Sequence, residues 1–176
     1  FAAVADTIEI RTGEKLLYST IWPLTDQKVY ADPEGTQELG KIPAGSAWCV
    51  MGQEGQYLKI RYGGQDAYVD SNYCMINLPE YMEDLCRYQI TNSYSSLFMV
   101  HDYEIPKVTD VVTGGYERVK MQNGEYLVPL LYPVAQRLEK AAFAAREEGY
   151  VLKIYDSFRP QMATYKLYDL INVLQD

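Results

Sequence analysis

The stretch that decides the fold is GQYLKIRYGGQDAYV, at residues 55–69. Apolar and polar side chains alternate from residue 56 to residue 62, as they do in a β-strand with one buried face. Gly63 and Gly64 follow directly, and a Gly-Gly pair marks a turn. Residues 67–69 supply the returning strand, so this stretch predicts a β-hairpin.

Further short strands precede the hairpin. Residues 28–31 form one before the turn-rich Asp-Pro-Glu-Gly at residues 32–35, and residues 40–45 lead into another at residues 47–51. Short strands at this spacing, about five in about 50 residues, are typical of a small β-barrel. The expected fold class is a small β-barrel followed by an α+β portion.

Residues 55–69 carry the pattern Gly-x-Tyr-x-Lys-Ile-x-Tyr-Gly-Gly-x-x-Ala-Tyr-Val. This pattern resembles the central hairpin and following strand of bacterial SH3-like domains, and the resemblance extends over residues 26–77. It implies an SH3-like β-barrel that binds peptidoglycan or positions a cell-wall hydrolase, but it identifies no binding residues. Four aromatic side chains could line a groove, although packing in the core or hairpin is their more common role: Trp48, Tyr57, Tyr62 and Tyr68.

A second informative stretch is YVLKIYDSFRP, at residues 150–160. Tyr150, Leu152 and Ile154 alternate with three other residues, which predicts a short strand with one buried face. Pro160 ends the strand, restricts the preceding residue to an extended conformation and suits the start of a helix. Arg159 is therefore expected at a rigid strand-to-helix junction, where it is either a functional residue or an ordinary surface arginine in a turn.

The sequence also predicts two helices and a domain boundary. Apolar residues recur at i, i+3 and i+4 before this stretch, which predicts a helix over residues 133–148, and a second amphipathic helix is expected over residues 161–174. Pro79 interrupts any strand near residue 77. We therefore expect an N-terminal segment at residues 1–25 and two domains, at residues 26–77 and 78–176.

The run Tyr-Asp-Ser-Phe-Arg-Pro at residues 155–160 is similar to the Tyr-Asp-x-(Tyr/Phe)-Arg-Pro signature of zinc D-Ala-D-Ala dipeptidases and D,D-carboxypeptidases of the vancomycin-resistance dipeptidase type. The resemblance covers residues 78–176, as the N-terminal portion of such an α+β peptidase domain. It implies that Arg159 is catalytic and stabilises the negative charge that builds on the scissile carbonyl oxygen. A fixed guanidinium aimed at that oxygen stabilises the transition state more than the substrate.

The same resemblance implies a zinc cofactor. The family binds zinc through a later Ser-x-His-x-x-Gly-x-Ala-x-Asp motif and a further histidine, and none of these follows Pro160 here. A catalytic zinc needs three protein ligands, and the single histidine, His101, is more typical of a structural hydrogen bond. We therefore expect that this chain alone binds no metal and is inactive. We also expect that its partner is the missing C-terminal half of the domain, which supplies the zinc site.

Composition excludes several classes of partner. A formal charge of −8 argues against nucleic acid and anionic membranes, and no apolar run approaches the length of a transmembrane helix. The 17 tyrosines suit either a glycan-handling surface or the edge of a β-rich core. Ala-Val-Ala at residues 3–5 matches the end of a signal peptide, or belongs to a flexible tail.

The cysteines leave their redox state open. With three cysteines, Cys49, Cys74 and Cys86, at least one is unpaired. A bridge between Cys49 and Cys74 is possible, but buried free thiols are expected.

Two functions remain open from the sequence. The first is a secreted or wall-associated bacterial peptidase that hydrolyses D-Ala-D-Ala-type peptides of peptidoglycan with zinc, joined to an SH3-like module. The alternative is a non-catalytic peptidoglycan-binding module attached to a scaffold domain. A serine or cysteine hydrolase is disfavoured, because no Gly-x-Ser-x-Gly motif occurs and one histidine makes a catalytic triad difficult.

Overall fold

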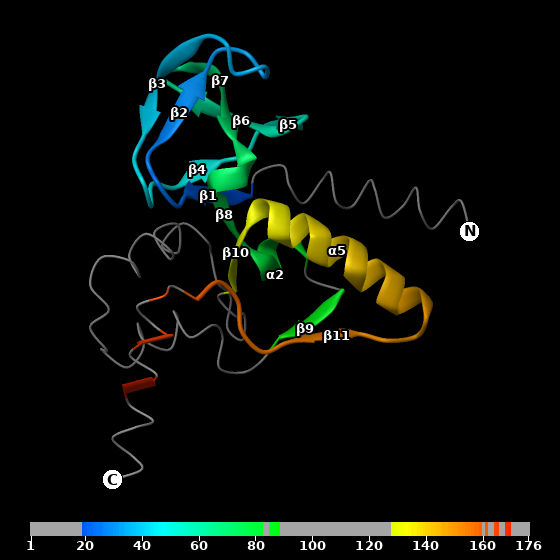
Figure 1. Cartoon of the computed structure of the whole chain (residues 1–176). Coiled ribbons are helices and arrows are strands. Elements are labelled where there is room, and N and C mark those ends of the chain that lie inside the picture. The colour runs from blue at the N-terminus through cyan, green and yellow to red at the C-terminus, as the bar shows by residue number, and fades with distance from the viewer. Residues whose placement is uncertain are drawn as a thin grey trace.

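The computed structural model describes residues 19–82, 85–88 and 128–159 together with positions 161, 164, 165, 168 and 169 (Figure 1). In this part of the chain, mostly antiparallel β-sheets are combined with one long helix. The expected β-rich character is therefore confirmed. The closed barrel and the peptidase-like portion stay predictions.

The predicted hairpin forms the centre of a five-stranded antiparallel sheet. The strand order is β3-β2-β7-β6-β5. Between β6 and β7, Gly63 and Gly64 adopt φ angles of 57° and 83°, the left-handed conformation that two-residue hairpin turns demand. The strands are β2 (Gln27–Tyr30), β3 (Glu38–Ile42), β5 (Gly52–Glu54), β6 (Tyr57–Tyr62) and β7 (Gln65–Asp70).

A second antiparallel sheet joins strands from both sides of the expected domain boundary. Its order is β10-β8-β1-β4. The central strands β1 and β8 are buried along their whole length, because neighbouring strands and the core enclose them. The members are β1 (Thr20–Pro23), β4 (Trp48–Cys49), β8 (Cys74–Asn77) and β10 (Pro129–Leu131).

The predicted long helix is confirmed as α5 (Tyr132–Glu147). Gly149, just past its end, has φ 83° and closes the helix in the left-handed conformation. Two shorter helical segments connect strands, namely the 3-10 turn η1 (Ser71–Tyr73) and α2 (Leu78–Tyr81). Of the expected second helix, the described positions are helical.

The predicted strand near residue 150 is shorter than expected. It is β11 (Leu152–Ile154), and it pairs in parallel with β9 (Cys86–Tyr88). Leu152 and Ile154 are half-buried, as the alternation predicts. The expectation for Tyr150 is wrong: it precedes the strand and is 67% exposed, because the chain leaves α5 at this point.

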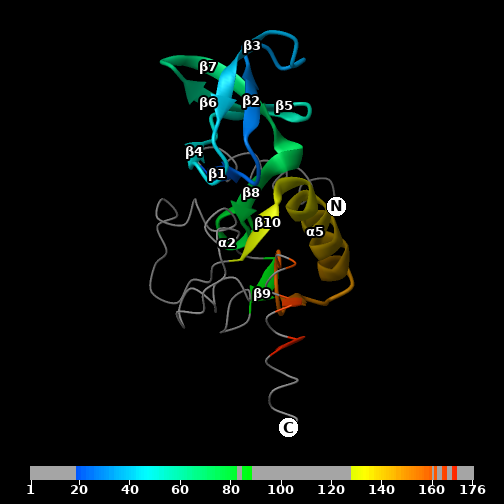
Figure 2. The same ribbon diagram turned by 60° about the vertical axis from the view of Figure 1, so that its left-hand side comes forward.

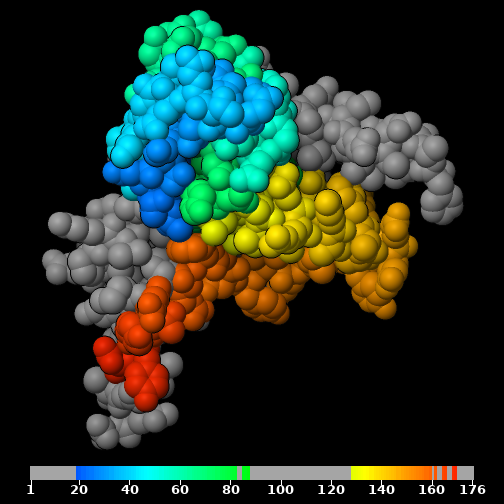
Figure 3. Space-filling view, turned by 45° about the horizontal axis from the view of Figure 1, so that its top comes forward, coloured from blue at the N-terminus to red at the C-terminus, as the bar shows by residue number. Residues whose placement is uncertain are grey.

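The larger of two hydrophobic clusters in the described residues joins both halves of the chain. It includes Ile60 and Val69 of the five-stranded sheet, Ile76 of the other sheet, and Ala135 and Ala142 of α5. Figures 1 and 2 show α5 running below the N-terminal strands and above the β9–β11 pair, and Figure 3 shows the helix in contact with both. The two halves of the chain therefore share packing.

The aromatic side chains singled out from the sequence pack within the N-terminal strands. Tyr57 meets Tyr30 edge-on at 6.0 Å between ring centroids, and Trp48 meets Tyr62 at 6.1 Å. Tyr68 is buried and donates a hydrogen bond to Glu54 Oε1 at 2.8 Å. These contacts favour the packing interpretation over an open aromatic groove.

All three cysteines are free thiols, so the Cys49–Cys74 bridge does not form. Cys74 and Cys86 are buried as expected, whereas Cys49 is exposed because it lies in β4, at the edge of its sheet. Burial raises the pKa of the Cys74 thiol to about 12 and that of Cys86 to about 11. Both thiols are therefore protonated at neutral pH and are poor nucleophiles or metal ligands.

Candidate functional site

Arg159 lies in the extended segment that follows β11. The strand is held by pairing Leu152 with Cys86 and Ile154 with Tyr88 in β9. Beyond Ile154 the chain continues through residues 155–159 without regular secondary structure. Strand ends of this kind place polar side chains at a surface while the scaffold holds their backbone.

Asp156 fixes the orientation of the Arg159 side chain. The Nε and Nη2 atoms of Arg159 donate to Asp156 Oδ2 at 2.9 Å and 2.6 Å. The backbone N–H of Ser157 donates to the other carboxylate oxygen, Oδ1, at 2.9 Å. Hydrogen bonds between charged groups are short and directional, so the carboxylate clamps one edge of the guanidinium.

This ion pair is only partly shielded from solvent. The Arg159 side chain is 33% exposed and the Asp156 side chain 20% exposed. Coulombic attraction is weakened by water at such a position, and exposed pairs contribute little to stability. The geometric effect of the clamp is therefore larger than its energetic effect.

Phe158 anchors the same turn to the body of the molecule. Its backbone N–H donates to the carbonyl oxygen of Pro129 in β10 at 3.0 Å. Its ring packs against a small cluster formed by the fully buried Trp22 and Met75. The aromatic residue that precedes the arginine in the sequence motif thus fixes the backbone from which Arg159 projects.

Ser157 contributes a polar group with no partner in the described part of the chain. Its Oγ atom is buried and makes no hydrogen bond there. A buried hydroxyl without a partner costs about 1–3 kcal/mol relative to a hydrated one. This turn therefore contains a group whose burial is unfavourable by itself.

A further cation lies close to the turn on β11. Lys153 Nζ lies 5.0 Å from the ring centroid of Tyr155, a cation–π contact at an exposed position. Together with Arg159, it places two positively charged side chains in the segment of residues 153–159.

The described residues do not form a zinc site. No group of three or more His, Cys, Asp or Glu side chains among them could hold a metal ion. His101 lies outside the described residues. The zinc that the sequence resemblance implies thus has no ligand set in this part of the chain.

The sequence singled out Arg159 but missed two residues on which its position depends. Asp156 is its carboxylate partner, and the i, i+3 spacing of the two opposite charges was an available signal. Phe158 is its anchor, which could not be inferred locally because Trp22 and Met75 come from distant strands. The candidate site is therefore the Asp156–Arg159 turn as a unit.

Comparison of the chain with protein-family models, curated proteins and solved structures gives no match. Within the described ranges, none of the helices combines the length and the apolar character needed to cross a membrane.

Proposed function

We propose that this chain is the wall-binding and arginine-bearing part of a zinc D-Ala-D-Ala peptidase of bacterial cell walls. The observation that carries the proposal is the clamped guanidinium of Arg159, held by Asp156 on a turn that Phe158 anchors. The resemblance of residues 155–160 to the peptidase signature gives that guanidinium its role.

The proposed role of Arg159 is to bind the oxygen that becomes negatively charged as the peptide carbonyl is attacked. Asp156 contacts the Nε and Nη2 atoms of the guanidinium and would orient it toward the substrate oxygen. A positioned donor needs no reorganisation when the charge develops, and its contribution is therefore largest in the transition state.

The N-terminal strands would form the SH3-like module that binds peptidoglycan. The hairpin β6–β7 at the centre of its sheet, with the Gly63-Gly64 turn, supports this proposal. In the proposed protein, zinc is held by residues other than those described, and the location is extracellular or cell-wall associated.

A non-catalytic peptidoglycan-binding protein is the second candidate. The observation that favours it is the same ion pair: a carboxylate that accepts two hydrogen bonds from Arg159 could equally well serve to tie the turn together. The two candidates predict different effects of removing the guanidinium, because only a peptidase loses hydrolysis.

The test begins by determining whether the natural reading frame continues past Asp176 into a Ser-x-His-x-x-Gly-x-Ala-x-Asp motif. The protein encoded by that frame is then assayed with zinc on D-Ala-D-Ala. We expect zinc-dependent hydrolysis that falls by about 10²–10³-fold in Arg159→Ala. Arg61→Ala is the matched control, because Arg61 also pairs with an aspartate, Asp66, at 2.9 Å but lies in the β6–β7 hairpin. A full-length protein without this hydrolysis would leave the binding module as the function.

A further inference from the structure

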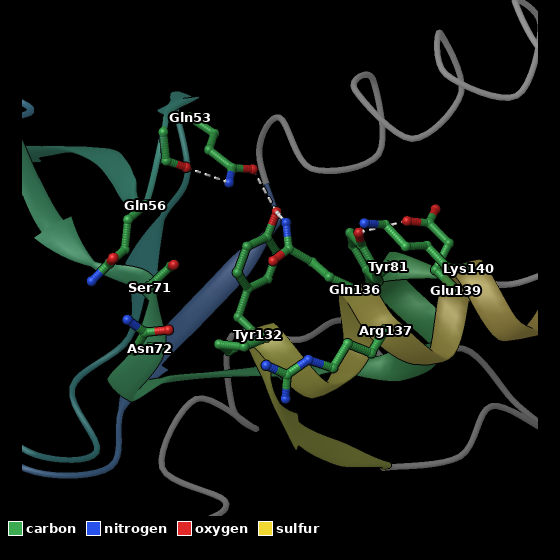
Figure 4. Close-up of a pocket in the computed structure, with 12 residues that line it drawn as sticks. Gln53, Gln56, Ser71, Asn72, Tyr81, Tyr132, Gln136, Arg137, Glu139 and Lys140 are labelled. Atoms are coloured by element: carbon green, nitrogen blue, oxygen red, sulfur yellow. Dashed lines mark hydrogen bonds between the residues drawn. The ribbon is translucent and has the colours of Figure 1, made fainter.

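A pocket of about 490 Å³ lies between the N-terminal strands and α5 (Figure 4). One wall comes from the β5–β6 turn and η1, and includes Gln56 and Asn72. The other comes from the first turns of α5, and includes Arg137 and Lys140. Its volume falls within the roughly 300–1,000 Å³ of small-molecule sites.

A hydrogen bond between the two walls helps to fix the shape of this pocket. Tyr132 of α5 donates its hydroxyl to Gln53 Oε1 at 2.6 Å and accepts from Gln136 Nε2 at 3.2 Å. Because Gln53 belongs to β5, this interaction ties the helix to the five-stranded sheet. Burial raises the pKa of Tyr132 to about 12, so its hydroxyl stays protonated and can donate at neutral pH.

A second buried interaction lies in the lining of the pocket. Tyr81 donates to Glu139 Oε2 at 2.9 Å, and both side chains are buried. The rings of Tyr81 and Tyr132 meet edge-on at 5.7 Å between centroids. Glu139, the acidic residue of the pocket lining, is thereby buried in a hydrogen bond with Tyr81.

The cations of the helix wall remain at the exposed side. Arg137 and Lys140 are three positions apart on α5 and therefore lie on the same face of the helix. Within the described part of the chain, neither makes an ion pair, although the whole protein carries a net charge of −8. Two exposed cations in the lining of one pocket, neither paired with a carboxylate among the described residues, favour an anionic ligand.

Amide side chains make up most of the remaining polar lining. Gln56 and Asn72 lie on the strand side, and Gln136 lies on the helix side beside Arg137 (Figure 4). An amide side chain both donates and accepts hydrogen bonds, so it matches the alternating N–H and C=O groups of a peptide. Arginine binds a carboxylate through two parallel hydrogen bonds.

We propose that this pocket binds the C-terminal end of a short peptide, with Arg137 and Lys140 on its carboxylate and the amide side chains on its peptide groups. The pocket is separate from the Arg159 turn in its lining residues. Binding here does not require hydrolysis, so this inference stands or falls independently of the peptidase proposal.

The test uses the chain itself and calorimetric titration with N-acetyl-Ala-Ala, compared with the same dipeptide blocked as its C-terminal amide. We expect saturable binding of the acid, and binding of the amide that is weaker by at least about tenfold, since a charge-assisted contact is lost. The double variant Arg137→Gln/Lys140→Gln should abolish binding of the acid. Arg146→Gln is the matched control, because Arg146 lies in the last turn of α5 and outside the pocket.

Several results would overturn the proposal. These are no saturable binding of the acid, equal binding of the acid and the amide, or full binding in the double variant. Tighter binding of N-acetylmuramic acid than of the dipeptide acid would show that the ligand is an acidic sugar and not a peptide.

Near-UV circular dichroism checks the fold of the double variant. Asn72→Ala is a second variant, and it should weaken binding from the opposite wall of the pocket. Arg61→Ala should bind the dipeptide normally, because Arg61 lies in neither this pocket nor the Arg159 turn.

Discussion

The turn that carries Arg159 and the pocket beside α5 use arginine in two different ways. Arg159 is clamped by Asp156 within a turn held by Phe158. Arg137 makes no ion pair among the described residues and borders a pocket whose walls are joined by buried tyrosines. A paired arginine has a fixed orientation, which suits a developing charge, whereas an unpaired one suits an anionic ligand.

The largest expected loss of stability comes from removing the anchor of the turn. Phe158→Ala deletes the ring that packs on Trp22 and Met75. Because Phe158 is half-buried, we expect a loss of about 2–3 kcal/mol, below the range for a fully buried phenylalanine. Urea unfolding measures it, with Tyr150→Ala, an exposed tyrosine just before β11, as the control that should change stability by less than about 0.5 kcal/mol. Equal effects of the two variants would contradict the anchoring role.

The stability of the protein should depend on pH at alkaline values, because burial raises the pKa of Tyr132 in the pocket lining. The pKa of Tyr132 is about 12 in the folded protein and about 10 when unfolded. The unfolded chain releases this proton first, so the stabilisation is complete below about pH 10 and is lost as the pH rises toward 12. We expect a loss of about 2 kcal/mol over that window, measured by urea unfolding.

Tyr132→Phe should make this pH dependence shallower, although Tyr81 retains part of it because burial also raises the pKa of that hydroxyl. At neutral pH the same variant should lose about 1–2 kcal/mol, because Gln53 loses its hydrogen-bond donor. A variant with an unchanged alkaline profile would show that Tyr132 is not buried as described.

Asp156→Asn distinguishes the effect of the ion pair on the orientation of Arg159 from its effect on the stability of the protein. The substitution keeps the shape of the side chain but removes the charge that holds Arg159. The pair is partly exposed, so we expect a loss of stability below about 1 kcal/mol. The peptidase proposal predicts that kcat falls by about tenfold while KM changes little, because misorientation affects the reacting geometry. A change in stability alone would assign a structural role to the pair.

The smallest effect is expected at Ser157. Ser157→Ala removes a buried hydroxyl that makes no hydrogen bond in the described part of the chain. We expect unchanged stability or a gain of up to about 1 kcal/mol, by thermal unfolding. A loss greater than about 1 kcal/mol would reveal a contact of this hydroxyl with another part of the protein.

The sequence predicted those elements whose signal is local. The hairpin β6–β7 shows strict alternation and a Gly-Gly turn, and α5 shows a helical period with Pro133 at its start. Strands β1 and β8 were missed because all their residues are buried, which removes the alternation that marks a strand. Strand β9 was also not predicted, because its partner β11 is distant in the sequence.

Of the two candidate sites, the sequence predicted only the one whose signal is local. Arg159 was found because its motif is contiguous in the chain. The pocket was missed because its lining comes from four separate segments, β5 with the β5–β6 turn, η1, α2 and α5, which only tertiary packing brings together. No periodicity of a single segment could predict that Tyr132 reaches Gln53.

The most direct test of the central claim compares how Arg159→Ala changes substrate turnover and the affinity for a phosphinate analogue of D-Ala-D-Ala in the full-length protein. The phosphinate carries a negative oxygen where the transition state develops one, so an oxyanion-binding arginine should affect both in the same proportion. We predict that kcat/KM and analogue affinity fall together by about 10²–10³-fold while KM stays within about threefold, with Arg61→Ala unchanged. Equal losses in both arginine variants, or a loss confined to KM, would contradict the role assigned to Arg159.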